Sequence, residues 1–115
     1  MTPGTVQTGR QAVEAAVSRF FHMLNTHCLA NVSPLLTSDV ELQADQAMKG
    51  LEAVNGYFKW LWDSYPSLAF RVESMIIDGT SVAAEVTYQD GPAKEGARCF
   101  VFQMRGELLR RIRCY

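Results

Sequence analysis

The stretch IIDGTSVAAEVTYQ, residues 76–89, decides the fold. Its Asp78-Gly79 pair is a strong signal for a tight turn between antiparallel strands, and the residues that follow alternate between apolar and polar. The same period of two recurs in four segments of the chain after Pro66: 68–77, 81–89, 97–105 and 107–115. This region therefore predicts four antiparallel strands joined by hairpins.

The chain before Pro66 has helical periodicity instead. Thr8 and Gln11 have the spacing of a capping box, which predicts a long amphipathic helix after a flexible segment 1–7. A shorter helix is expected over 29–36, where Pro34 fits only the first turn.

Two more elements complete the first half of the chain. Ser38-Asp39 is expected to end the second helix, and alternating residues predict a short strand over 40–45. A third helix is expected to open at Gly50 and stop at Pro66. Helices followed by hairpin strands predict an α+β domain over 8–115.

Composition sets limits on function. The chain has 115 residues, a mass of 12.9 kDa and a net charge of −1, which does not favour nucleic-acid binding. No apolar run is long enough to cross a membrane, and the first residues lack the pattern of a secretory signal. Three cysteines and two histidines in unsuitable spacings predict no disulfide framework and no metal site. We therefore expect free, buried or half-buried thiols without a catalytic role, no cofactor and a cytoplasmic location.

Several motifs together resemble the nuclear transport factor 2-like superfamily, which includes ketosteroid isomerase, limonene-epoxide hydrolase and SnoaL-like polyketide cyclases. They are AVSRFFHMLN at 16–25, LLTSDVEL at 35–42, KGLEAVNGYF at 49–58, DGTSVAAEVTY at 78–88 and RGELLRRIRCY at 105–115. The resemblance implies three N-terminal helices packed on a strongly curved, mainly antiparallel sheet. This cystatin-like roll would enclose a conical apolar pocket.

The resemblance does not supply the known catalytic groups. The tyrosine, the basic aspartate and the protonated aspartic acid of ketosteroid isomerase fall on Phe20, Ala44 and Arg98, so a classical isomerase is not expected. The catalytic positions of the epoxide hydrolase fall near Val86, Tyr88 and Arg113, which also lack the required chemistry. Proteins with this fold catalyse many different reactions, and some of them are not enzymes.

Strand alternation and the family register together predict the residues that face the pocket. The expected ligand-binding wall is Phe20, Tyr57, Val82, Val86, Phe100, Phe102 and Arg113. The candidate catalytic residues are Asp45, Arg98 and Tyr88. An inward guanidinium at Arg98 is costly unless it meets a carboxylate or an anionic ligand. Asp45, at a strand end, is the obvious acidic candidate, although alternation points it outward unless a bulge intervenes. A structural ion pair of Arg98 with a carboxylate, or an Arg98 side chain in water, stays open.

Two functions are compatible with this pattern. One is cofactor-independent acid–base chemistry, of the cyclase, isomerase, dehydratase or hydrolase type, on a hydrophobic substrate with a carbonyl or carboxylate. The other is a non-catalytic ligand-binding or dimeric accessory module. A homodimer is expected through the outer sheet face, where alternation places Ala83, Cys99, Val101, Ile112 and Cys114. Trp60 is expected on the polar face of its helix, as part of a contact surface.

Overall fold

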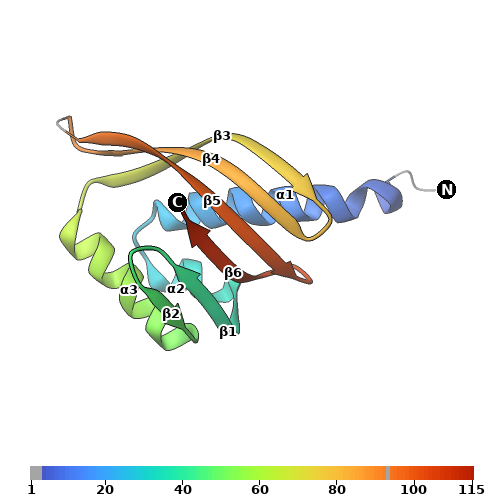
Figure 1. The fold of residues 1–115 in the computed structure, drawn as a ribbon, viewed down its shortest axis with the longest axis horizontal. Helices are drawn as coiled ribbons and strands as arrows, with labels where there is room; N and C mark the ends of the chain where they lie inside the picture. Colours follow the sequence, from blue (N-terminus) through green and yellow to red (C-terminus); the bar gives the residue numbers. More distant parts are fainter. Residues whose placement is uncertain (1–3, 93) are drawn as a thin grey trace.

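The strands after Pro66 form most of a six-stranded sheet (Figure 1). The computed structural model describes residues 4–92 and 94–115. The four predicted strands are confirmed, with bounds within a few residues of those expected: β3 Leu68–Asp78, β4 Ser81–Asp90, β5 Glu95–Arg105 and β6 Leu108–Cys114. Gly79, in the β3–β4 turn, has φ 61°, a conformation that glycine adopts without steric cost.

The rest of the sheet comes from the first half of the chain. Strand β1 (Leu36–Gln43) lies parallel to β6, and the short β2 (Ala47–Lys49) pairs antiparallel with β1. The strand order is β2-β1-β6-β5-β4-β3. The sequence prediction missed β2 and placed the preceding strand at 40–45. The strand instead begins at Leu36, because Leu36 pairs with Leu109 of β6.

Three α-helices precede or interrupt these strands: α1 Gly4–Leu24, α2 Leu29–Val32 and α3 Leu51–Ser64. Helix α1 begins before the expected capping box at Thr8, since no glycine or proline interrupts residues 5–8. Of the expected flexible segment 1–7, residues 1–3 lie outside the described residues. The expected helix over 29–36 is shorter, because a 3₁₀ turn, Ser33–Leu35, follows α2 around Pro34. The prediction that Ser38-Asp39 ends a helix is therefore wrong.

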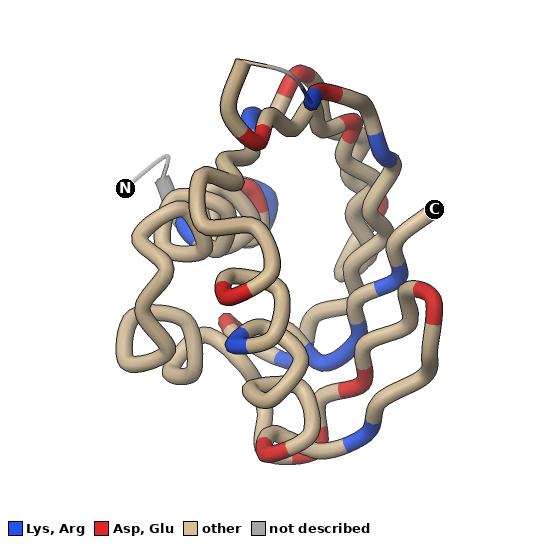
Figure 2. Tube along the Cα trace, turned by 90° about the vertical axis from the view of Figure 1, so that its left-hand side faces the viewer, with Lys and Arg blue, Asp and Glu red and all other residues tan. Residues whose placement is uncertain are grey.

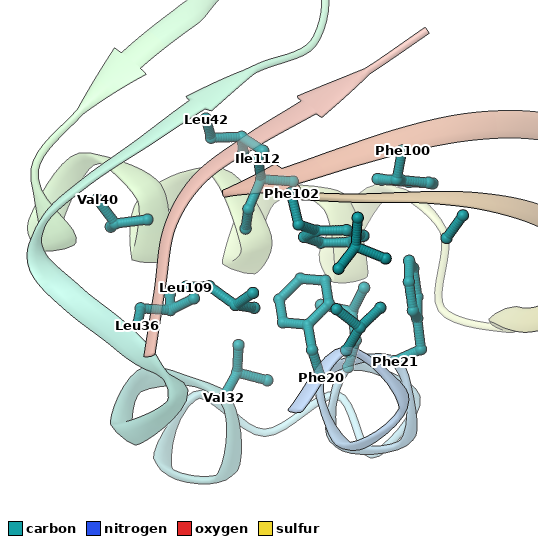
Figure 3. Packing of buried hydrophobic residues seen from close by; sticks show 14 of the residues in the cluster. Phe20, Phe21, Val32, Leu36, Val40, Leu42, Phe100, Phe102, Leu109 and Ile112 are labelled. Atoms are coloured by element: carbon teal, nitrogen blue, oxygen red, sulfur yellow. The ribbon is translucent and has the colours of Figure 1, made fainter. Parts of the chain in front are cut away.

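The helices cover the concave side of the curved sheet. Helix α1 packs against β3 and β4, whereas α3 packs against β1 and β2 (Figure 1). Between them, Phe20 and Phe21 of α1 meet Phe100 and Phe102 of β5 (Figure 3). The Phe20 and Phe102 ring centroids are 5.6 Å apart in an edge-to-face arrangement, which is favourable for aromatic pairs. Phe20 and Phe100 of this cluster also line the cavity described below.

The end of α1 is attached to the edge strand β3. The Asn25 side chain donates to the Phe70 carbonyl and accepts from the Phe70 amide, both at 2.8 Å. His27 Nε2 lies 2.6 Å from the Leu68 carbonyl oxygen, and its ring stacks on Trp62 of α3. These contacts fix α1 and α3 relative to the sheet, and with them the walls of the site described below.

Candidate functional site

A cavity of about 400 Å³ lies between the helices and the concave side of the sheet. Aromatic side chains from four elements form much of its wall: Phe20 of α1, Tyr57 and Phe58 of α3, Phe70 of β3, and Phe100 of β5. Trp60 of α3 also lines it although 53% of its surface is exposed, so it lies at the mouth. The expectation that Trp60 is exposed is therefore confirmed.

Arg98 lines this cavity from β5. It lies directly opposite Val86 in the β4–β5 pairing, and Val86 is buried, so both side chains are on the concave face. The guanidinium carbon is 6.0 Å from the centroid of the Tyr88 ring. In residues 4–92 and 94–115, no carboxylate forms an ion pair with Arg98. The side chain is exposed rather than buried, so it pays little desolvation penalty while it lacks a partner.

Asp45 lines the same cavity from the turn after β1. The alternation of the strand predicted an outward side chain, but β1 ends at Gln43 and the alternation ends with it. The Ala44 amide bonds to the Gln46 carbonyl at 3.1 Å, which bends the chain. The two charged candidates of the sequence, Asp45 and Arg98, therefore share one cavity without an ion pair between them.

Tyr57 and Cys114 are two half-buried cavity groups close to both charges. Burial raises the pKa of the Tyr57 phenol, and Asp45 adds to this effect whereas Arg98 opposes it. Burial also raises the pKa of the Cys114 thiol, again opposed by Arg98 and supported by Asp45. Both groups consequently stay protonated at neutral pH, and Tyr57 is a hydrogen-bond donor for a bound oxygen atom.

The cavity lining contains two further charged groups that the sequence prediction missed. Lys94 and Asp90 line the cavity next to the β4–β5 loop. The Lys94 ammonium lies 4.5 Å from the centroid of the Tyr65 ring, and an Asp90 carboxylate oxygen accepts from the Ser67 amide at 3.2 Å. Lys94 lies in a loop without a periodic pattern, so nothing in the sequence pointed it to the cavity. Asp90 is the last residue of β4, one position beyond the expected end of the strand at 89.

The remaining predicted wall residues divide into three groups. Phe20, Tyr57, Tyr88 and Phe100 line the cavity. Val82, Val86 and Phe102 face inward as predicted, but they are fully buried in the core beneath the cavity wall. Arg113 lies on the opposite face of the sheet, so its expected place in the cavity is wrong.

A β-bulge in β6 explains the error at Arg113. Met104 pairs with Leu109, but Gln103 pairs with Arg111, so Arg110 is an extra residue. The bulge reverses the alternation. Ile112 and Cys114 consequently face the cavity rather than the outer surface, where they had been expected.

A smaller depression of about 200 Å³ lies on the outer face beside β1 and β2. Arg113 lines it with Glu41, which accepts a hydrogen bond from Arg111 Nε at 3.1 Å and lies 3.8 Å from the Lys49 ammonium. Elsewhere the charges are mixed: blue and red segments are interspersed along the tube (Figure 2).

The described part of the chain contains neither a membrane-spanning helix nor a metal-binding cluster. None of the helices within residues 4–92 and 94–115 is long and apolar enough to cross a membrane. In the same residues, His, Cys, Asp and Glu side chains form no group of three that could hold a metal ion. The three cysteines are free, with Cys99 and Cys114 half-buried, but Cys28 is exposed, contrary to the expectation of buried thiols.

The position of Cys114 leads to a prediction about its reactivity. In a Cys28→Ser/Cys99→Ser variant, iodoacetamide should alkylate Cys114 more slowly than it alkylates Cys28 in the matching Cys99→Ser/Cys114→Ser variant. The raised pKa of Cys114 leaves less thiolate, which is the reacting form. The rate of Cys114 should keep rising at pH values above the ordinary pKa of a thiol, because burial raises its pKa. Equal alkylation rates of Cys114 and Cys28, measured by mass spectrometry, would contradict this placement.

Helices that cover the concave side of one curved sheet, with a cavity between them, define the cystatin-like class of α+β proteins. The sequence matches the model of the SnoaL-like domain family over residues 17–112. The chain therefore belongs to the SnoaL-like domain family, as the sequence motifs had indicated.

Solved structures with the same fold carry names of different activities. A candidate polyketide cyclase from Sinorhizobium meliloti is similar with a TM-score of 0.81 and 12% identity, over 88% of this chain and 94% of that one. A candidate ketosteroid isomerase from Kribbella flavida has a TM-score of 0.78 and 18% identity, over 90% of this chain and 76% of that one. An LEH-like epoxide hydrolase from M. tuberculosis has a TM-score of 0.76 and 19% identity, over 91% of this chain and 82% of that one. No curated protein matches the sequence. At these identities the comparisons show the fold, and the chemistry has to be argued from the cavity.

Proposed function

We propose that the cavity binds a small organic anion with a hydrophobic body, such as an aromatic or aliphatic carboxylate, and that Arg98 holds the anionic group. The observation that carries this proposal is the Arg98 guanidinium, which lines a largely aromatic cavity without an ion-pair partner in the described chain. A guanidinium has donors in a planar fork that fits a carboxylate with two parallel hydrogen bonds. A cavity of about 400 Å³ is within the range of small-molecule sites.

A pair of matched ligands tests the anionic requirement. 2-Naphthoate and 2-naphthamide have the same ring system, but only the first is charged. The naphthoate should raise the melting temperature of the protein clearly more than the amide, because ligand binding stabilises the folded state. Equal stabilisation by the two compounds would leave a hydrophobic site without a role for Arg98.

The same cavity supports a cofactor-independent proton transfer as its reaction. The Asp45 carboxylate would take a proton from the carbon beside a substrate carbonyl, and the electron pair would move to the carbonyl oxygen. Arg98 and the protonated Tyr57 phenol would stabilise the resulting enolate, as preorganised donors do in other enzymes. Return of the proton from Asp45 to another carbon completes an isomerisation. Attack of the enolate carbon on a second carbonyl, whose oxygen then takes the proton from Asp45, completes a cyclisation.

The alternative is a non-catalytic binding module with the same anionic ligand. Exchange of the α-protons of 1-tetralone in D₂O, followed by NMR, separates the two. An enzyme should accelerate the exchange above buffer, and Asp45→Asn should remove the acceleration. Binding of 2-naphthoate without any accelerated exchange would favour the binding module.

We also propose that two copies of the chain pair through the outer sheet face. Ile76, Ala83 and Val101 are cross-strand neighbours on this face, and Ile76 is 73% exposed. Arg113 of β6 pairs with Val101 and continues this row, and Glu85 lies two residues after Ala83 along β4. A two-fold axis near Ala83 would cover the apolar residues of each copy with those of the other, which favours this pairing.

Light scattering is expected to give twice the chain mass of 12.9 kDa at micromolar concentration. Ile76→Asp should shift the protein to the monomer without affecting its fold, because the side chain contacts solvent in a single copy. Ala15→Asp, an equivalent change on the exposed side of α1, should leave the dimer intact. A wild-type mass of one chain up to millimolar concentration would contradict the proposal.

The cytoplasm is the location that we propose for this protein. Its three cysteines are free. Cys99 and Cys114 belong to neighbouring strands but point to opposite faces of the sheet, so they are not placed to form a disulfide. Free thiols are typical of reducing compartments.

A further inference from the structure

Gly96 lies inside β5, directly opposite Tyr88 of β4. A Cβ atom added to Gly96 would lie 2.6 Å from Cζ and 2.8 Å from Cε1 of the Tyr88 ring. Non-bonded carbon atoms prefer separations of about 3.5–4.0 Å. The Tyr88 ring therefore lies across the place that a side chain at position 96 would occupy.

The backbone gives no other reason for glycine at this position. Gly50, Gly79, Gly91 and Gly106 have positive φ angles, which favour glycine, but Gly96 does not. Cβ atoms added to Gly9 or Gly56 would meet nothing within 4 Å. Glycine inside a strand weakens it and often marks a close approach of another group. Here the approaching group is the Tyr88 ring.

The position of this ring affects the part of the cavity that contains Arg98. Arg98 is two residues after Gly96 on the same face of β5, and Tyr88 and Arg98 both line the cavity. On the other side of Tyr88, the Phe70 ring of β3 has its centroid 6.5 Å away. Phe70 occupies that side, and the Arg98 guanidinium carbon is 6.0 Å from the ring centroid, so a ring displaced from Gly96 is expected to turn towards Arg98.

We propose that Gly96 is a specificity-determining residue of this cavity. It leaves room for the Tyr88 ring against β5 and thereby keeps the Arg98 end open to anions attached to a fused or similarly broad ring. This inference rests on the proposed binding function, since it concerns the size of the ligand that Arg98 receives. Gly96 acts through Tyr88, so it is a positioning residue rather than a ligand contact.

The test is a cycle of four proteins: wild type, Gly96→Ala, Tyr88→Ala and the double variant. Affinity for 2-naphthoate, measured by titration calorimetry, should fall about tenfold in Gly96→Ala, which corresponds to about 1.4 kcal/mol. Because the group that has to move is the tip of a half-buried side chain, the fold should stay intact by circular dichroism. Benzoate, which is smaller, should lose less affinity than 2-naphthoate.

The double variant decides whether the effect passes through the ring. It should bind 2-naphthoate as Tyr88→Ala does, because no ring is left to displace. The same tenfold loss on the Tyr88→Ala background would overturn the proposal and indicate a general distortion of β5. Gly56→Ala, at a glycine whose added Cβ meets nothing, is the matched control and should bind like the wild type.

A ligand-free measurement keeps this inference separate from the proposed function. If the wild type does not bind 2-naphthoate, the proposed function fails, but the position of Tyr88 can still be measured by NMR. Nuclear Overhauser contacts between the Tyr88 ring and the Gly96 α-protons are expected in the wild type. The Tyr88 ring signals should shift in Gly96→Ala. Absence of these contacts, or an unchanged Tyr88 environment in the variant, would overturn the role of Gly96.

Discussion

Replacement of Arg98 by methionine is expected to lower the affinity for 2-naphthoate by about 10- to 100-fold. Hydrogen bonds to charged groups contribute about 1.5–3 kcal/mol, and about 1.4 kcal/mol corresponds to a factor of ten in binding. Methionine keeps much of the apolar side chain and removes the charged fork. The affinity for neutral 2-naphthamide should therefore change much less, and titration calorimetry with both compounds measures the difference.

Two further variants show whether the guanidinium itself is responsible. Arg98→Lys keeps the charge without the planar fork and should give an intermediate affinity. Arg71→Met removes an arginine whose side chain is 83% exposed and which does not line the cavity, so it should bind like the wild type. If Arg98→Met also binds like the wild type, the anion is held elsewhere, and Lys94 is the other cation that lines the cavity.

Replacement of Phe102 by alanine is expected to reduce the free energy of unfolding by about 3–5 kcal/mol, as for other buried aromatic side chains. Phe102 is fully buried, and its ring contacts those of Phe20, Phe21 and Phe100 (Figure 3). Domains of this kind are stable by only about 5–15 kcal/mol. The variant should therefore unfold at a much lower urea concentration, or fail to fold at room temperature.

Conservative changes provide the comparison for this core position. Phe102→Leu keeps most of the apolar volume and should cost clearly less than Phe102→Ala. Leu108→Ala, at a position that is 37% exposed, should also cost less, because less of its surface is removed from water on folding. Similar unfolding midpoints for Phe102→Ala and Leu108→Ala would contradict the packing of the aromatic core.

The predictable part of the fold is the part with a regular period. Alternation placed Val82 and Val86 on the buried side, because hairpin strands with one buried face need apolar side chains at every second residue, and the family register added Phe102. Alternation could not show that these three residues lie below the cavity wall, since burial depth depends on which helix covers each position. Alternation also could not reveal the bulge at Arg110. Leu109 before the bulge and Ile112 after it are isolated apolar residues among arginines, so they are compatible with either register.

The candidate site was predictable where its residues belong to regular helices and strands. Phe20 and Tyr57 of the helices, Tyr88 by strand alternation and Arg98 by the family register were all expected at the cavity and do line it. Asp45 follows the end of β1, so its direction depends on a turn that alternation does not describe. Lys94 comes from a loop, and its contact with Tyr65 joins two segments that no local pattern connects.

The parallel pairing of β1 with β6 has a consequence for how the chain folds. Leu42 and Ile112 are partners in this pairing although 70 positions apart, so a long loop has to be closed before the two strands can meet. Without β6, the hairpin β1–β2 and the meander β3–β4–β5 would be separate pieces, each with an unpaired edge. Such non-local pairing raises the contact order, which predicts folding in milliseconds to seconds rather than microseconds. It also predicts a single cooperative transition, because neither piece completes the core by itself.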